Sequence, residues 1–219
     1  MSRRFVTLGR LAALCSILVF TLAACSDDDG EPLAAYVRTL AEVTTDASGQ
    51  AATVTPDGGS ALRVTNKVSG LVRDSLYRVQ ALILPDNEGG AAVRQLAAVL
   101  SPFPREVAED KRRYDPVDVL ALWSTGRYVN MRLALRTATE PHAFTFVEEG
   151  TDNLPDGTRR LRLHLYHDRG GNPEYYTRET YLSCPLFHYA DVLRAGTDSV
   201  YFTVTTYAGE RTLRICYGE

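Results

Sequence analysis

The chain has 219 residues, of which 45% are hydrophobic and 23% charged, and its net charge is −3 at pH 7. The 27 acidic residues outnumber the 24 lysines and arginines, so the composition excludes a basic nucleic-acid-binding protein. The length allows one large domain or two small ones.

The first 24 residues have the three parts of a bacterial export signal. Three arginines make the start positive, residues 11–22 are apolar or small, and residues 22–24 supply the small side chains that a signal peptidase needs. The apolar stretch is shorter than the roughly 20 residues of a membrane-spanning helix. Residues 1–24 therefore predict a signal peptide that is removed, rather than a retained anchor.

Cys25 directly follows Leu22-Ala23-Ala24. This arrangement resembles the signal of bacterial lipoproteins, in which the cysteine becomes the acylated first residue of the mature protein. Lipid attachment at Cys25, of the palmitate type, is therefore expected, and the alternative is plain secretion. One acyl chain holds a protein only marginally, so a stable anchor needs two or more chains.

Residues 25–32 form an acidic tether that begins with Ser26-Asp27-Asp28-Asp29. Such a segment is expected to be solvated and without secondary structure. Acidic residues after the lipidated cysteine also resemble the surface-export signal of Bacteroidetes lipoproteins. We expect a lipid anchor in the outer membrane with the protein on the cell surface, and the periplasmic face as the alternative.

Residues 33–103 predict a small five-stranded barrel of OB type. Residues 76–84 predict the strongest strand, with Tyr77, Val79, Ala81 and Ile83 on one face, and the turns at 56–59 and 86–90 contain Asp and Gly. Several short strands within about 70 residues suit a closed Greek-key barrel.

Residues 114–219 predict an antiparallel β-sandwich of about seven strands. Proline residues break the pattern at 101–104, and the charged segment 105–113 predicts one or two helical turns. In the sandwich, a third strand is expected at 142–147, followed by a loop at 150–157. A short helical turn is expected at 189–194. The whole chain is thus assigned to the all-β class.

The order of these parts resembles the NigD-like lipoproteins of Bacteroidetes. The segments that carry the resemblance are Thr55-Pro56-Asp57-Gly58-Gly59, Asp115-Pro116-Val117-Asp118-Val119, Trp123, Tyr128-Val129-Asn130-Met131, the strand at 161–168 and the hairpin that begins at Asp198. The family is named for a bacteriocin gene cluster, and the resemblance implies a role similar to that of an immunity factor. It implies no catalytic residues.

Two cysteines, Cys184 and Cys216, remain in the predicted mature domains. An exported protein meets conditions that allow disulfides, but a bridge needs Cα atoms within about 7 Å. The sequence leaves open either a disulfide or two buried thiols.

No catalytic, cofactor or metal site is predicted. His164 and His167 lie three apart on one strand, so their side chains point to opposite faces. Glu148 and Glu149 are adjacent, and we interpret them as a solvated strand end. The segment 152–157 lacks the ligand spacing of a calcium loop and fits a turn.

The sequence therefore predicts a non-enzymatic binding protein, monomeric, held to the lipid bilayer by its acylated N-terminus. The lead hypothesis is recognition of an envelope protein or peptide in bacteriocin self-protection. The alternatives are glycan binding as an accessory of a nutrient-uptake system and a structural role in the envelope. Tyr175, Tyr176, Tyr181 and Tyr189 are candidates for an exposed binding platform, or for packing within the sheets.

Overall fold

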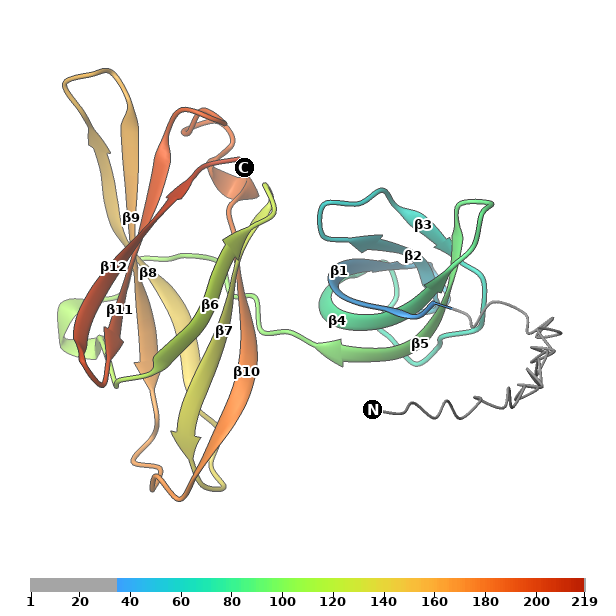
Figure 1. Ribbon diagram of the computed structural model, residues 1–219, viewed down its shortest axis with the longest axis horizontal. Coiled ribbons are helices and arrows are strands. Elements are labelled where there is room, and N and C mark those ends of the chain that lie inside the picture. The colour runs from blue at the N-terminus through green and yellow to red at the C-terminus, as the bar shows by residue number, and fades with distance from the viewer. Residues whose placement is uncertain (1–34, 219) are drawn as a thin grey trace, which may run out of the picture. The chain divides into compact units, whose positions relative to one another are not determined.

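The computed structural model describes residues 35–218, so the signal peptide, Cys25 and the acidic tether lie outside the described residues. Within this range, the regular structure consists of strands and two short 3₁₀ turns (Figure 1). No described helix is long and apolar enough to cross a membrane. The described residues belong to one compact unit.

The first five strands close into a barrel with the order β1-β2-β3-β5-β4, which confirms the OB-like prediction (Figure 1). Their bounds are β1 (Val37–Thr45), β2 (Ala51–Pro56), β3 (Leu62–Val64), β4 (Leu76–Pro85) and β5 (Gly90–Ala98). The short strand β3 pairs parallel to β5, and the other pairs are antiparallel.

Alternate residues of these strands fill the barrel. Val43, Val54, Ala81 and Ile83 are completely buried. Asp46 shapes the turn between β1 and β2, because its carboxylate accepts hydrogen bonds from the backbone N–H of Ser48 and Gln50. The barrel is thus specified by strand alternation and by turns built on side-chain hydrogen bonds.

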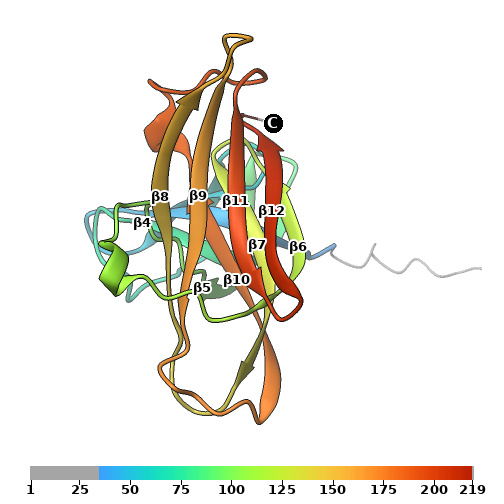
Figure 2. The ribbon, with the colours of Figure 1, turned by 90° about the vertical axis from the view of Figure 1, so that its left-hand side faces the viewer.

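Seven further strands form two packed sheets, as Figure 2 shows. The three-stranded sheet has the order β10-β7-β6, and the four-stranded sheet has the order β12-β11-β9-β8. The bounds are β6 (Asp118–Ser124), β7 (Tyr128–Thr137), β8 (Ala143–Asn153), β9 (Arg159–Asp168), β10 (Tyr176–Pro185), β11 (Ser199–Thr206) and β12 (Gly209–Cys216).

The predicted β-sandwich is confirmed, and its strands pair antiparallel except at one place. β11 pairs parallel to β9, from Ser199 opposite Arg160 to Thr203 opposite His164. The strand between them in sequence, β10, belongs to the other sheet. The chain therefore crosses the sandwich and returns beside β9 in the same direction, the crossover that a parallel pair requires.

The sandwich core lies between the two sheets. Met131 and Leu133 of β7 belong to the same core cluster as Phe146 of β8, Leu163 of β9 and Phe202 of β11, and all five are completely buried. Burying a side chain of this size contributes about 1.5–3 kcal/mol. The alternation in residues 128–136 and 161–166 therefore identified the core-facing side of both sheets.

β8 is longer than predicted. It continues to Asn153 instead of ending at Val147, and the following loop spans only 154–158. Its register with β9 shifts between Glu148 and Gly150, so Glu149 is the extra residue of a β-bulge. Gly150 has a φ of 121°, a value that L side chains rarely adopt. Because the bulge interrupts the alternation, the strand pattern of the sequence ends there although the strand does not.

Residues 99–117, between the barrel and β6, form the linking segment, which runs along the edges of the sandwich. Isolated parallel bridges join Leu100 to Leu182 on β10, Arg105 to Val147 on β8 and Tyr114 to His167 on β9. The one or two helical turns predicted in 105–113 are a single 3₁₀ turn, Glu109–Lys111. The helical turn predicted at 189–194 is a 3₁₀ turn at Phe187–Tyr189, slightly earlier than expected. The bridges cover part of the open edges of β8 and β10.

Two of the segments that carry the family resemblance meet through Arg78 of β4. Both guanidinium Nη atoms donate to the Asp57 carboxylate at 2.6 Å, and Nη2 also donates to Asn130 Oδ1 at 2.9 Å. Arg78 Nε donates to Ser183 Oγ at 3.0 Å, and Asn130 Nδ2 donates to Asp57 at 3.0 Å. These residues therefore join the barrel to the three-stranded sheet.

Candidate functional site

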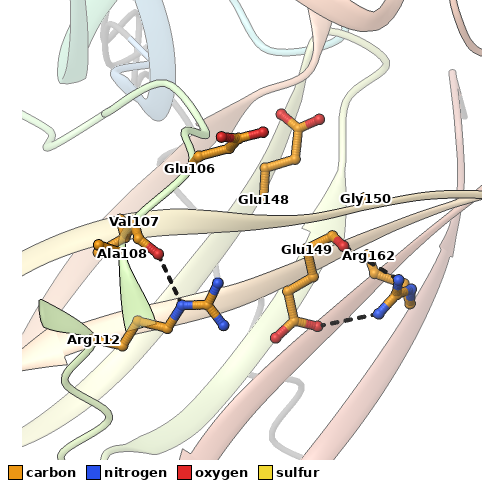
Figure 3. A pocket seen from close by; sticks show the side chains of 8 residues that line it. All are labelled: Glu106, Val107, Ala108, Arg112, Glu148, Glu149, Gly150 and Arg162. Atoms are coloured by element: carbon orange, nitrogen blue, oxygen red, sulfur yellow. Dashed lines mark hydrogen bonds and ion pairs between the residues drawn. The ribbon is translucent and has the colours of Figure 1, made fainter. Parts of the chain in front are cut away.

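A pocket of about 740 Å³ lies between the linking segment and the strands β8 and β9 (Figure 3). The linking segment contributes Glu106, Val107, Ala108 and Arg112. The two strands contribute Glu148, Glu149, Gly150 and Arg162. The volume is in the range of small-ligand pockets, about 300–1,000 Å³.

The bulge in β8 explains why two adjacent glutamates line this pocket. The expectation of a strand end at Glu148 and Glu149 is wrong, because β8 continues to Asn153. Their side chains do point in different directions, since Glu148 contacts Tyr189 and Glu149 lies near His164. With Glu149 as the extra residue of the bulge, the strict alternation of the strand is lost. Figure 3 shows the Glu148 carboxylate beside that of Glu106, while Glu149 is directed toward the arginines.

The charges in the pocket are only partly balanced. Arg162 is bound to Asp152 at 3.1 Å and lies 3.8 Å from Glu149. Arg112 Nε donates to the carbonyl of Val107 at 2.9 Å.

Glu148 accepts a hydrogen bond of 2.6 Å from the hydroxyl of Tyr189. Among the ion pairs of the described residues, none includes Glu106 or Glu148. Two carboxylates at the same side of the pocket therefore lack a cation.

A buried histidine lies next to Glu149. The His164 side chain stacks on the Tyr114 ring with 3.7 Å between ring centroids, and its Nδ1 lies 3.4 Å from the Glu149 carboxylate. His164 is 6% exposed, and neither its Nε2 nor the Tyr114 hydroxyl has a hydrogen-bond partner within the described part of the chain. Two unsatisfied buried polar atoms are costly and mark a site where a ligand or water adds stability.

Burial changes the protonation of these side chains. It lowers the pKa of His164, and the neighbouring Glu149 charge only partly opposes the shift. Burial also raises the pKa of Tyr114, and burial together with the hydrogen bond to Glu148 raises the pKa of Tyr189. At neutral pH the imidazole and both phenols are therefore uncharged, and the charge of the site comes from Glu and Arg.

His167 belongs to a different environment, as the spacing of the two histidines predicts. Its Nε2 lies 2.7 Å from His142 Nδ1, and its Nδ1 lies 2.8 Å from the carbonyl oxygen of Asp115. His164 and His167 therefore do not share a site. Between residues 35 and 218, no group of three or more His, Cys, Asp or Glu side chains is arranged to hold a metal ion.

The segment 152–157 is a strand end and a turn. Asp152 accepts hydrogen bonds from Arg160 and Arg162 at 3.0 and 3.1 Å. Asp156 accepts hydrogen bonds from the backbone N–H and the hydroxyl of Thr158. Turn chemistry accounts for Asp156, as the sequence indicated, whereas cross-strand ion pairs with Arg160 and Arg162 account for Asp152.

The two cysteines of the sandwich lie on different sheets. Cys184 of β10 is a free thiol, completely buried in the core, and burial raises its pKa. Cys216 ends β12, pairs with Ser199 in the register and is half-buried. The structure thus shows Cys184 as a buried thiol, one of the two alternatives that the sequence left open.

The four tyrosines considered as a platform do not form one. Tyr189 is buried in the core, and Tyr175 is 81% exposed on the loop before β10. The hydroxyl of Tyr176 donates to the carbonyl of Ala138. Tyr181 lines a separate pocket beside Trp123, which the sequence alone did not indicate.

Several solved structures of proteins from Bacteroides and Parabacteroides share this architecture. A NigD-like immunity protein from Bacteroides caccae is 27% identical, with a TM-score of 0.63 over 84% of this chain and 93% of that chain. A protein described as "Putative TOXIN related protein" from Parabacteroides distasonis is 16% identical, with a TM-score of 0.63 over 84% of this chain and 94% of that one.

A third structure, described as "Putative lipoprotein" from Bacteroides fragilis, is 13% identical, with a TM-score of 0.59 over 84% of this chain and 98% of that chain. At such low identity the last two show the fold alone. No curated protein matches the chain. The family model of the NigD-like C-terminal beta sandwich domain matches residues 101–217, more than half of the sequence. The chain therefore belongs to the NigD-like family.

Proposed function

We propose that this protein is a lipid-anchored envelope protein that binds an extended peptide segment bearing a basic side chain, and that it catalyses no reaction. The observation that carries the proposal is the pair of carboxylates, Glu106 and Glu148, that line one pocket without a cation. A guanidinium or ammonium group of the peptide would bind between them. Charge-assisted hydrogen bonds of this kind are roughly twice as strong as neutral ones.

The backbone beside the pocket suits an extended peptide. β8 is the edge of its sheet, and the linking segment bridges it at Val147. From Gly150 to Asn153, no described strand pairs with the outer edge of β8. A peptide strand added to this edge would gain backbone hydrogen bonds while the pocket selects its side chain.

The pocket lining contains no hydroxyl, thiol or amine nucleophile. None of its lining residues is Ser, Thr, Cys, His or Lys. The Glu148 carboxylate accepts the Tyr189 hydroxyl hydrogen, and Arg162 is held by Asp152. Because these polar groups are already engaged with other side chains, binding is the role that we propose for the pocket.

The cellular setting of the proposal comes from the N-terminal sequence and from the relatives. Cys25 would carry the lipid, and the acidic residues 27–29 would direct the protein to the outside of the outer membrane. The relative from Bacteroides caccae is described as an immunity protein. A basic bacteriocin peptide captured at the envelope would fit both the pocket and that description.

Titration of the mature protein with synthetic peptides tests the proposal. The probe is a short peptide of alternating Thr and Val with a central Arg, and the comparison peptide has Gln at that position. We expect the Arg peptide to bind at least about tenfold more tightly. The double variant E106Q/E148Q should lose this preference.

The matched control is E109Q, because Glu109 lies on the exposed 3₁₀ turn outside the pocket. It should bind both peptides as the wild type does. Equal binding of the Arg and Gln peptides to the wild type, or an undiminished preference in E106Q/E148Q, would reject the proposed function.

A further inference from the structure

A second pocket, of about 480 Å³, lies where β1 and β4 of the barrel approach the three-stranded sheet. Its lining includes Arg38, Asp57, Gln80, Trp123, Thr125 and Tyr181. It shares no lining residue with the pocket beside β8.

One side of this pocket is aromatic. Trp123 lies on β6 and Tyr181 on β10, and their rings are 6.4 Å apart with an interplanar angle of 83°. In the register of the sheet, Trp123 is opposite Asn130 and Tyr181 is opposite Arg132, so both rings lie on the sheet face that points away from the sandwich core. Both side chains are half-buried.

The polar tips of these rings are available to a ligand. Neither the indole N–H of Trp123 nor the hydroxyl of Tyr181 takes part in any of the hydrogen bonds between described residues. Neither of the two polar atoms is a buried atom without a partner, so both are accessible to solvent. A half-buried aromatic side chain normally satisfies its polar tip. The pocket thus presents apolar ring surface together with an unused donor and an unused hydroxyl.

The other side of the pocket is polar and planar. Arg38 Nη1 donates to Gln80 Oε1 at 3.4 Å, a long contact, and no carboxylate of the described residues forms an ion pair with Arg38. Asp57 is fixed by its two hydrogen bonds from Arg78. The exposed guanidinium of Arg38 and the amide of Gln80 thus line the same pocket as the aromatic rings, with most of their hydrogen-bonding capacity unused.

We propose that this pocket binds a pyranose unit of a saccharide. A pyranose ring has apolar C–H faces, which pack on aromatic rings, and a rim of hydroxyl groups, which pair with planar groups such as guanidinium and carboxamide. The unpaired Arg38 charge adds a preference for a sugar that carries a carboxylate. The pocket volume is within the range of small-ligand sites.

The chain itself supplies the probe for a direct test, because Trp123 is its one tryptophan. The mature protein is titrated with the methyl glycosides of glucose, galactose, mannose and N-acetylglucosamine and with galacturonic acid, while tryptophan fluorescence is recorded. We expect a saturable change with at least one sugar. In Y181S and in R38Q, the affinity for that sugar should fall about tenfold or more.

Y175S is the matched control, since Tyr175 is exposed and outside the pocket. It and E148Q should bind the sugar as the wild type does, which separates this site from the proposed peptide site. The absence of a fluorescence change with every sugar overturns the proposal. A change that persists in both Y181S and R38Q overturns it equally, as does a response to the Arg peptide that Y181S abolishes.

Discussion

Replacing Arg78 by Met removes the centre of the hydrogen-bonded network that joins barrel and sandwich. The Arg78 side chain is 3% exposed and its partner Asp57 is 13% exposed. Arg78 donates two hydrogen bonds of 2.6 Å to Asp57 and further bonds to Asn130 and Ser183, and its guanidinium lies 4.1 Å from the centroid of the Tyr128 ring.

Met has a similar length, so the substitution removes charge and hydrogen bonds more than volume. Removing one partner of a buried ion pair leaves the other charge uncompensated, at a cost of about 3–5 kcal/mol. At a urea dependence of about 2 kcal/mol per M, the midpoint of unfolding should fall by roughly 1.5–2.5 M. The second substitution, D57N, removes the uncompensated negative charge of Asp57. The double variant R78M/D57N should therefore recover part of the stability that R78M loses.

Urea unfolding followed by Trp123 fluorescence and by circular dichroism measures the effect. The control is R136M, because the Arg136 side chain is 45% exposed in its ion pair with Glu174. An exposed pair contributes about 0–1 kcal/mol, so R136M should unfold near the wild-type midpoint. The reasoning is refuted if R78M unfolds within about 1 kcal/mol of the wild type, or if R78M/D57N is no more stable than R78M.

Three further outcomes are expected. C25S should move the protein from the membrane fraction to the soluble fraction and abolish lipid labelling; unchanged fractionation together with unchanged labelling would exclude the anchor. Burial lowers the pKa of both His142 and His167 below the value of about 6.5 in an unfolded chain. The stability that the two neutral histidines contribute is therefore complete above about pH 6.5 and is lost as the pH falls through their folded-state pKa values. A melting temperature that does not change between pH 7.5 and 5 would contradict this. G150A should destabilise by about 1–3 kcal/mol, because φ at Gly150 is 121°, and it should cost more in thermal unfolding than G157A in the open turn, where φ is 78° and a Cβ meets nothing within 4 Å.

The comparison of sequence and structure is clearest at β8. The alternation in 142–147 predicted the start of the strand, and the Gly-, Asp- and Asn-rich residues that follow predicted a loop. The structure continues the strand through Gly150 by means of a bulge. A bulge depends on the partner strand, because it is defined by two residues opposite one, and a single sequence contains no record of that pairing.

The second pocket illustrates the same limit for function. Trp123 and Tyr181 are far apart in the sequence, and each is an ordinary aromatic residue of a predicted strand. They meet because β6 and β10 both pair with β7. Arg38 and Gln80 reach the same place from the barrel. Residue type indicated the chemistry of each side chain, but only the strand order placed them around one cavity.

The sequence by itself determined the all-β class and predicted an export signal and lipidation at Cys25, since these depend on local composition and on alternation along single strands. It also determined which residues of 128–136 and 161–166 face the core. Tertiary structure alone decided the parallel pairing of β9 and β11, the bulge at Glu149 and the joint at Arg78. These depend on contacts between distant segments, such as that between Arg78 and Ser183, which are 105 residues apart, and no local pattern encodes which distant segments will pack together.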